Sequence, residues 1–479
     1  MNRPLLLLLI FCIAATQALS QANHCNCSGN FEKLIEKTEA NYAGFPTKIN
    51  TATQTAYQSL VRKIRQQIVT ENNPKRCYYL LAEYVQFFRD KHFILSYANE
   101  KDADIETIEI DESGFKKSLS LKKTEGIEGI WVNPDSSMKL AISKFPGNVY
   151  KAIVLTSADP KLFPGLVYLT FLPSKKGLRV KTYNVFMTTE VPAKQKGNLL
   201  QVWNQQLFGR IYPGSMSTEE KNELRTWRDH NNGLAFRQLS ARTTHLKIPS
   251  FYNNDDKIQA LISRSDSMIR NTENLIVDLT GNGGGNTGWV HFMPYFMTNP
   301  VIQEDTHLRV TPENVKARKE GMAAFVLSPI PDEYKKYFPD SLINVYKKVY
   351  AELSITKEPF YPTPAVTFPL DSILSKPIKI ALLVDDLCGS STEYFFYLSK
   401  QSRKTIRYGI PTMGMMDYEG MSNPTPLPYD KFILTIPIAR SSWTTRNPID
   451  DTGFKPEKDL GHIPAEHWVE HVRMELENK

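Results

Sequence analysis

The stretch Leu275-Ile276-Val277-Asp278-Leu279-Thr280-Gly281-Asn282-Gly283-Gly284-Gly285 decides the fold of this chain. Residues 275–279 are mostly apolar, which predicts a buried strand. The glycines that follow allow backbone N–H groups to approach a ligand closely and to converge on an anion. A phosphate-binding loop is disfavoured because the Lys and Ser/Thr that close such a loop are missing. A plain tight turn is the alternative interpretation.

A second strand-to-helix turn lies about a hundred residues further on. The expected strand at residues 378–384 leads into Asp386-Leu387-Cys388-Gly389-Ser390-Ser391-Thr392-Glu393, and a helix is expected over residues 392–400. A serine at such a junction lies at the positive end of the helix dipole, where a backbone N–H can stabilise an oxyanion. The more common use of serine at this position is as the helix N-cap.

Strands alternate with helices around both turns. This alternation predicts an α/β layer with parallel strands, which begins at about residue 243. Further strands are expected at residues 245–248 and 431–438, and a helix at residues 258–269. The segment at about residues 299–364 is expected to be a mostly helical, polar insertion that forms a lid or arm over a site.

Composition shifts divide the chain into four segments. Residues 1–20 are expected to be a signal peptide, and residues 21–108 a helical region. Residues 109–213 contain short β-rich runs separated by Gly, Pro, Asn and Asp, which predicts a β-rich domain. Residues 214–479 are expected to form the α/β core. A chain of 479 residues is too long for a single hydrophobic core, so two or three domains are expected.

The N-terminus has a short apolar run behind Arg3. The run is too short to span a bilayer, and Ala18-Leu19-Ser20 supplies the small residues that a signal peptidase requires. We therefore expect cleavage after Ser20 and a periplasmic or extracellular mature protein. A lipid anchor is disfavoured because no cysteine follows a small-residue box.

Charge and cysteine usage exclude several classes of protein. The net charge of +7 is spread thinly, without a basic block interleaved with aromatic residues, so no nucleic-acid partner is expected. Four cysteines remain after removal of the signal peptide, too few for a disulfide scaffold. Either Cys25 or Cys27 is expected to pair with Cys77, and Cys388 to stay unpaired. No second cysteine knuckle follows Cys25 and Cys27, so no metal or other cofactor is expected.

Taken together, the two turns resemble the tail-specific, or C-terminal-processing, serine proteases, a family that includes the tricorn core protease. The family pattern has an L-I-x-D-L-R-G-N-G-G-G strand and turn, a T-x-S-x-x-E turn that carries the nucleophile, a G-x-x-T-x-G stretch and a G-[IV]-x-P-[DE] tail. The equivalents here are residues 278–285, 390–393, 409–414 and 453–457, in the same order. The resemblance extends from about residue 243 to the C-terminus. It implies a crotonase-like α/β protease core.

The resemblance implies that Ser390 is the nucleophile and that His92 activates it. Bacterial processing enzymes use a lysine just after the G-x-x-T-x-G stretch, but Met415 occupies that position here. Members with a histidine base carry it upstream in a D-G-H-[ST] motif, whose equivalent is DKHF at residues 90–93. Such a base activates the serine hydroxyl. The alternative is a surface histidine at a helix C-terminus.

The resemblance also implies a carboxylate that orients the base. Tricorn-like members place a glutamate three residues before the tail glycine, and Asp450 stands there in this chain, with Asp451 as its rival. The shorter side chain implies either a direct or a water-mediated contact with His92. Thr280 stands where the family usually has arginine.

An oxyanion hole is expected from two backbone N–H groups. One belongs to the glycine turn, at Gly283 or Gly284, and the other to Ser391. Such donors stabilise the tetrahedral intermediate, and the loss of one typically costs about 3 kcal/mol.

The sequence therefore predicts a secreted serine endopeptidase that acts on peptides or proteins through an acyl-enzyme on Ser390. A non-catalytic member of the same fold, which binds peptides or other ligands, is the alternative. An esterase is a third possibility, but the G-x-S-x-G pattern typical of such hydrolases is absent at residues 388–392. The sequence leaves the oligomeric state open.

Overall fold

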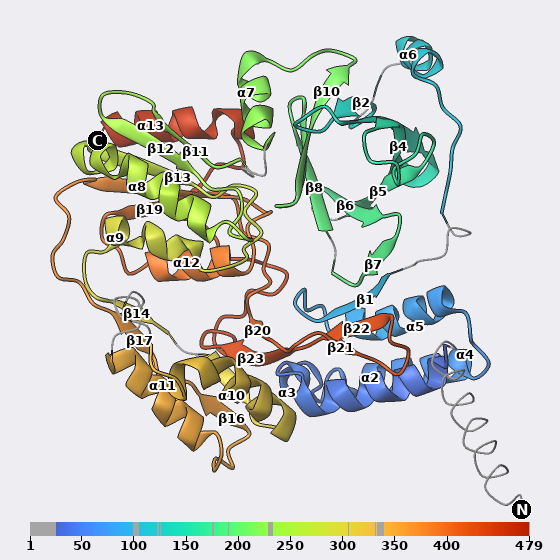
Figure 1. The fold of residues 1–479 in the computed structure, drawn as a ribbon, viewed down its shortest axis with the longest axis vertical. Coiled ribbons are helices and arrows are strands. Elements are labelled where there is room, and N and C mark those ends of the chain that lie inside the picture. Colours follow the sequence, from blue (N-terminus) through green and yellow to red (C-terminus); the bar gives the residue numbers. More distant parts are fainter. Residues whose placement is uncertain are drawn as a thin grey trace, which may run out of the picture.

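The computed structural model describes residues 25–98, 105–121, 124, 126–174, 177–189, 191–228, 233–304, 306–330, 332 and 340–478. The expected signal peptide lies outside these residues. Figure 1 shows the α/β core beside a β-barrel, with the N-terminal helices below the barrel and a further pair of helices below the core.

The core is built on a six-stranded sheet. Across the sheet its strands are β11 (Ala235–Gln238), β12 (Thr243–Lys247), β13 (Asn274–Asp278), β18 (Lys379–Val384), β19 (Thr405–Gly409) and β24 (Lys458–Asp459). Only β11 runs antiparallel to its neighbour. The parallel strands β13 and β18 are adjacent, so their carboxyl ends bring the glycine turn and the Ser390 turn together at one edge.

Helices cover both faces of this sheet (Figure 1). The helices are α8 (Asp255–Asn271), η5 (Gly288–His291), α9 (Met293–Phe296), α12 (Ser391–Ser399), η7 (Ala465–His467) and α13 (Trp468–Asn478). Leu275 and Val277 pack on the side of α8 and α12, whereas Ile276 packs on the side of α13. Side chains alternate between the faces of a strand, and therefore a strand covered on both faces is apolar throughout.

The β-rich segment forms a closed barrel of eight antiparallel strands. They are β2 (Gly129–Val132), β3 (Met138–Phe145), β4 (Val149–Ser157), β5 (Val167–Ser174), β6 (Gly177–Thr182), β8 (Val191–Lys196), β9 (Leu199–Val202) and β10 (Gln206–Tyr212). Trp131, Phe171 and Phe208 are among the buried side chains that fill the interior. Two helices, α6 (Glu112–Ser120) and α7 (Thr218–Thr226), flank the barrel, and η3 (Pro146–Asn148) joins β3 to β4. Pairing of β9 with β10 closes the barrel, and closure leaves no free sheet edge.

The N-terminal helices pack against a small sheet whose strands come from three parts of the chain. The helices are α2 (Cys27–Asn41), α3 (Phe45–Lys48), α4 (Gln54–Ile68) and α5 (Pro74–Phe87). The sheet has the order β21 (Thr425–Pro426), β22 (Phe432–Thr435), β1 (Ile94–Ala98) and β7 (Val185–Met187). A disulfide joins Cys27 of α2 to Cys77 of α5, while Cys25 is a free, buried thiol. Of the two pairings that the sequence left open, the structure contains that of Cys27.

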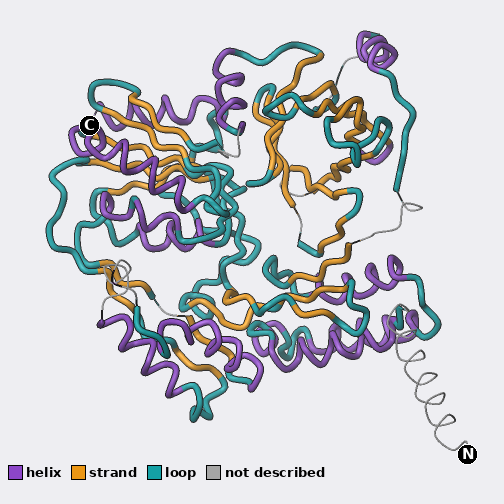
Figure 2. Tube along the Cα trace, viewed as in Figure 1, coloured by secondary structure: helices purple, strands orange, loops and turns teal. Residues whose placement is uncertain are grey.

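The insertion contains strands as well as helices (Figure 2). Its elements are β14 (Val301–Gln303), β15 (Thr306–Arg309), α10 (Pro312–Val326), α11 (Asp340–Glu352) and β16 (Phe360–Pro362), followed by β17 (Val366–Phe368). We expected a mostly helical insertion, but helices form only part of this segment and strands form the rest of its regular structure. β15 pairs with β23 (Pro437–Ser441), whose other neighbour is the edge strand β20 (Tyr418–Met421). This pairing ties the insertion to the C-terminal part of the chain.

None of the helices in the described part of the chain combines the length and the apolar character that crossing a bilayer requires.

Candidate active site

Ser390 has a strained backbone. It precedes helix α12 with φ 52° and ψ −123°, a conformation that residues with a Cβ rarely adopt. Strain of this kind persists only where the surroundings impose it, and it concentrates at functional sites. Its half-buried hydroxyl is thereby held at the mouth of the turn between β18 and α12.

His92 lies directly beside this hydroxyl. The distance from His92 Nε2 to Ser390 Oγ is 3.0 Å, and the distance from His92 Nδ1 to the carbonyl oxygen of Tyr418 is 2.7 Å. A carbonyl oxygen only accepts hydrogen bonds. Nδ1 therefore carries a hydrogen and donates a hydrogen bond to the carbonyl oxygen of Tyr418. Nε2 is then the acceptor for the Ser390 hydroxyl. The tautomer is therefore the one that a general base needs.

The N-terminal region places His92 next to Ser390, although the two residues are far apart in the sequence. The ring belongs to the turn between α5 and β1, and β1 pairs with β22 from the C-terminal part of the chain. Asp90 accepts from the backbone N–H of His92 at 2.9 Å and from the hydroxyl of Tyr42 at 2.8 Å. Lys91 Nζ donates to the carbonyl of Gly414 at 2.7 Å. These bonds fix the backbone on both sides of the ring.

Asp450 does not touch the imidazole. Its carboxylate accepts from Lys48 Nζ at 2.5 Å, and its backbone N–H donates to Asp417 at 2.7 Å. The direct carboxylate contact with His92 is therefore replaced by the Tyr418 carbonyl. The rival residue, Asp451, is exposed, has φ 68° and lines an open cleft that Asp386 also lines.

Burial lowers the pKa of His92 below its usual value. The hydrogen bond to Tyr418 opposes this shift, and so do the negative charges of Glu393 and Asp450. The ring is consequently neutral near neutral pH, the state in which it accepts a proton.

Glu393 links the Ser390 turn to residues 412–415. It is fully buried, and burial raises its pKa. Its carboxylate accepts from the hydroxyl of Thr412 at 2.7 Å and from the backbone N–H groups of Gly414 at 2.6 Å and Met415 at 2.9 Å. The N–H of Ser390 also donates to it, at 3.2 Å. This explains why a serine turn and a distant G-x-x-T-x-G stretch occur in one pattern.

The glycine turn packs directly against Ser390. A Cβ on Gly284 would lie 2.8 Å from the Cβ of Ser390 and 2.9 Å from the N of Ser391. However, the N–H of Gly284 already donates to the side chain of Asn282 at 2.9 Å. In this state Gly284 is therefore not a free oxyanion donor. Ser391, as the first residue of α12, has no intrahelical acceptor for its N–H.

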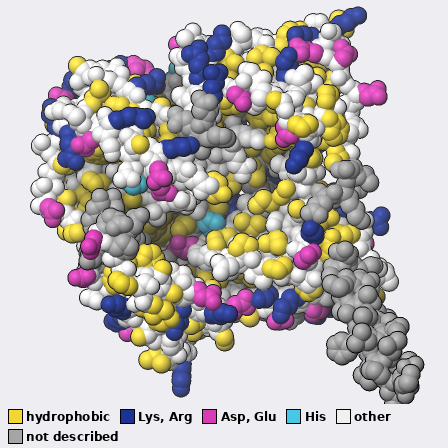
Figure 3. Space-filling model, in the orientation of Figure 1, with side chains coloured by type: hydrophobic (Ala, Val, Ile, Leu, Met, Phe, Trp, Pro, Cys, Tyr) yellow, Lys and Arg dark blue, Asp and Glu magenta, His cyan; other side chains and the backbone are white. Residues whose placement is uncertain are grey.

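A cavity of about 280 Å³ opens beside these groups. Its lining includes His92, Ser390, Ser391 and Gly285. Gly283 and Gly284 are not among the lining residues, so Gly285 is the glycine of the turn that faces the space where a substrate would bind. Figure 3 shows the surface hollowed where the core, the barrel and the N-terminal helices meet.

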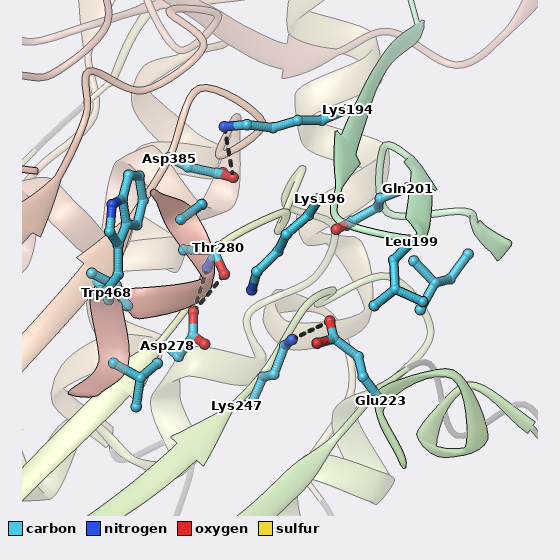
Figure 4. Close-up of a pocket in the computed structure, with 14 residues that line it drawn as sticks. Lys194, Lys196, Leu199, Gln201, Glu223, Lys247, Asp278, Thr280, Asp385 and Trp468 are labelled. Atoms are coloured by element: carbon cyan, nitrogen blue, oxygen red, sulfur yellow. Dashed lines mark hydrogen bonds and ion pairs between the residues drawn. The ribbon is translucent and has the colours of Figure 1, made fainter. Parts of the chain in front are cut away.

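The barrel supports the site from the other side. The indole Nε1 of Trp203, in the turn between β9 and β10, donates to the carbonyl of Leu387 at 3.0 Å. The same ring lies against Gly283, where a Cβ would come within 2.1 Å of Nε1. Lys194 of β8 lies 3.6 Å from Asp385, just ahead of the nucleophile turn (Figure 4). The barrel therefore contacts both turns of the site.

Thr280, which departs from the family pattern, has a local role. Its hydroxyl and its backbone N–H donate to Asp278 at 2.6 and 2.9 Å (Figure 4). The Gln201 side chain of the barrel approaches the carbonyl of Gly281 at 3.4 Å. The start of the glycine turn is thus fixed by Asp278 and the barrel.

Sequence reasoning missed three contributors to this arrangement. Tyr418 acts through its backbone carbonyl, which no side-chain pattern reveals. Trp203 and Gly285 matter through their position against the turns. The run of three glycines marked the segment that contains Gly285, whereas Trp203 lies in a domain that carried no recognisable motif.

Part of the chain matches a known protein family. Residues 242–460 match the model of peptidase family S41. Among solved structures, a mutant of CPAF is similar, with a TM-score of 0.51 and 13% identity over 94% of this chain and 96% of that chain. The tricorn protease gives a TM-score of 0.42 and 11% identity over 95% of this chain and 37% of that chain. The photosystem II D1 C-terminal processing protease gives a TM-score of 0.37 and 10% identity over 92% and 93%. No curated protein sequence matches the chain.

A histidine hydrogen-bonded to a strained serine beside a cavity is typical of serine hydrolases. The matched residues include both the glycine turn and the Ser390 turn. Residues 242–460 are therefore similar to peptidase family S41, and this similarity supports a serine peptidase.

Proposed function

We propose that the protein is an exported endopeptidase that cleaves peptide bonds through an acyl-enzyme on Ser390, with His92 as the general base. The observation that carries this proposal is the 3.0 Å hydrogen bond between His92 Nε2 and Ser390 Oγ. A crotonase-like core as scaffold is part of the proposal. So is the division of the chain into segments 1–20, 21–108, 109–213 and 214–479.

In the proposed reaction, neutral His92 takes the hydroxyl proton as Ser390 Oγ bonds to the carbonyl carbon of the substrate. The resulting imidazolium gives that proton to the leaving amine when the C–N bond breaks. Water then attacks the acyl carbon while His92 takes one of its protons, and that proton passes to Ser390 Oγ as the acyl C–O bond breaks, which releases the acid product. Every proton that leaves a reacting group in this sequence passes through Nε2.

The oxyanion would be stabilised by the N–H of Ser391 together with one from the glycine turn. Gly283 or Gly284 is the expected donor of the turn, and Gly285 is a further candidate because it lines the cavity. Gly284 would contribute only if its bond to Asn282 were broken. Two donors aimed at the developing charge supply a large part of such catalysis.

The imidazolium would be stabilised without a contacting carboxylate. Its Nδ1–H donates to Tyr418, while Glu393 and Asp450 act through their charge alone. The role proposed for Asp450 is therefore electrostatic.

Export is supported by the Cys27–Cys77 disulfide, because structural disulfides persist in oxidising compartments. Expression of the full chain, followed by N-terminal sequencing of the protein outside the cytoplasm, tests this part of the proposal. A mature protein that begins after residue 20 is expected, and a cytoplasmic protein that retains residues 1–20 would refute export.

Labelling with a fluorophosphonate probe tests the nucleophile. We expect the native protein to be labelled and to cleave peptides, and Ser390→Ala to lose both properties. His92→Ala should lower kcat/KM by about 10²–10⁴-fold. Met415→Leu, a nearly volume-conserving change at the position of the lysine base in other members, should keep most of the activity.

Several outcomes would contradict the mechanism. A folded protein that resists labelling would be a binding protein. Labelling that survives in Ser390→Ala would exclude this nucleophile. Faster turnover of simple esters than of any peptide would indicate an esterase.

A further inference from the structure

The described lining of the cavity beside Ser390 contains one acidic side chain. Among the described residues that line it, Glu419 is the only carboxylate, and no Lys or Arg lines it. The other polar side chains around Glu419 include Gln303 and Thr306, from the insertion. Among the described lining residues, Glu419 is therefore the acidic group, and Arg318, which is outside the lining, opposes its charge.

The carboxylate of Glu419 is incompletely bonded. Its Oε1 is buried and has no hydrogen-bond partner among the residues that the structure describes. Burial raises the pKa of Glu419 to about 7, against the opposing charge of Arg318 and a hydrogen bond with Ser441. A buried carboxylate oxygen without a donor costs free energy, so its retention in a substrate cavity favours a role in binding.

Glu419 is rigidly placed relative to the proposed base. It follows Tyr418 in strand β20, and the Tyr418 carbonyl accepts the hydrogen bond of the His92 ring. Neighbouring residues of a strand point to opposite faces. Accordingly, Tyr418 packs among the N-terminal helices, whereas Glu419 lines the cavity. One strand thus fixes both the ring of the base and the cavity carboxylate.

We infer that Glu419 determines specificity by binding a cationic side chain, of lysine or arginine type, next to the scissile bond of the substrate. This inference rests on the proposed function, because it assigns the substrate class of the same site. An ammonium or guanidinium group in the cavity places N–H donors and a positive charge next to the carboxylate of Glu419. A neutral side chain of equal length leaves the carboxylate unpaired, and an acidic one is repelled.

The first experiment uses the native full-length protein and needs no variant. Internally quenched peptides of one neutral sequence carry either lysine or acetyl-lysine at each of three positions on either side of the cleaved bond. Acetylation keeps the chain but removes the charge. We expect kcat/KM to be at least about tenfold higher for lysine at a position next to the cleaved bond, a factor equivalent to about 1.4 kcal/mol.

The second experiment compares two variants with the same loss of charge. Glu419→Gln should reduce the lysine to acetyl-lysine ratio to near one. Glu304→Gln is the matched control, since the Glu304 side chain accepts from Ser442 at 2.6 Å and is not among the residues that line the cavity. Its ratio should equal that of the native protein. Circular dichroism verifies that both variants are folded.

The outcomes separate this inference from the proposed function. Equal rates for the two peptides, both lost in Ser390→Ala, would overturn the role of Glu419 and leave the peptidase mechanism intact. A lysine preference that persists in folded Glu419→Gln would overturn it as well. If no peptide is cleaved and the fluorophosphonate labels nothing, both proposals fail. If Glu419→Gln does not fold, the peptide comparison on the native protein decides alone.

Discussion

Backbone groups define the chemistry at the scale of single residues. Ser390 is held at φ 52°, and His92 is oriented by the carbonyl of Tyr418. Either geometry would be lost through a change in the backbone, even if both side chains were kept. In many serine triads a carboxylate contacts the histidine. Here the expected carboxylate, that of Asp450, is paired with Lys48 instead.

This pairing predicts an unusual effect of Asp450→Asn. Replacement of a contacting triad aspartate by asparagine lowers kcat by about 10⁴-fold. Asp450 acts only through its charge, and so we expect a much smaller loss, at most about tenfold. The negative charge of Asp450 raises the pKa of His92, so its removal should lower that pKa.

The pH–rate profile measures this shift. Because the neutral ring is the base, kcat/KM of the native protein should fall only at a pH below about 6.5, the ordinary pKa of histidine. In Asp450→Asn the acid limb should move to still lower pH. Asp451→Asn serves as the control and should leave the limb in place. A 10⁴-fold loss of kcat in Asp450→Asn would show that the carboxylate contacts the ring during catalysis.

Elements from two domains form the site. The two turns follow the adjacent strands β13 and β18. Trp203 of the barrel packs against the glycine turn. A barrel that contacts only its own segment would be an independent module. Its contacts to Leu387 and Gly283 instead make it part of the frame that holds the nucleophile.

We therefore predict that Gly283→Ala damages activity through the barrel. The new Cβ would lie 2.1 Å from Nε1 and 2.3 Å from Cε2 of Trp203, so the ring or the turn must shift. Overpacking of this kind costs about 1–3 kcal/mol, and we expect kcat/KM to fall by about 10- to 100-fold.

A double-mutant cycle tests this explanation. In Trp203→Ala the additional effect of Gly283→Ala should be much smaller, because the clash is gone. Gly321→Ala is the control glycine, since nothing lies within 4 Å of its added Cβ. Additive losses in the cycle would show that Gly283 acts independently of the barrel.

At the scale of the whole molecule, the site depends on an N-terminal region that is remote in sequence. His92 and Ser390 are 298 positions apart. The base is carried by the α2–α5 helices, which are cross-linked by the Cys27–Cys77 disulfide and docked through β1 onto β22. Loss of this docking would remove the base while the core sheet stayed folded.

The disulfide should therefore protect activity. It closes a sequence separation of 50 residues, for which chain-entropy arguments give about 4 kcal/mol. We expect Cys27→Ala/Cys77→Ala to lower the melting temperature and to lose activity at a lower temperature than the native protein. Thermal scans with and without a reductant measure this effect. Reductant should destabilise the native protein but leave the double variant unchanged, and an equal response of both would contradict the prediction.

The sequence determined much of the core by itself. Apolar runs such as residues 275–279 specify strands covered on both faces, because a sheet between two helical layers has no solvated side. Gly284 can approach Ser390 so closely because it lacks a Cβ. The family resemblance likewise implies Ser390, through the order of the motifs, and His92, through residues 90–93. In the β-rich segment the sequence indicated strands but not closure into a barrel, since closure depends on the pairing of β9 with β10.

Only the tertiary structure decided which groups surround His92. A backbone carbonyl such as that of Tyr418 is present at every residue and leaves no mark in the sequence, so its choice as partner follows from strand placement alone. The same holds for Asp450, whose partner is Lys48, and for Glu419, whose neighbours come from distant segments. Local sequence fixes which conformations a segment prefers, whereas long-range packing fixes which atoms meet.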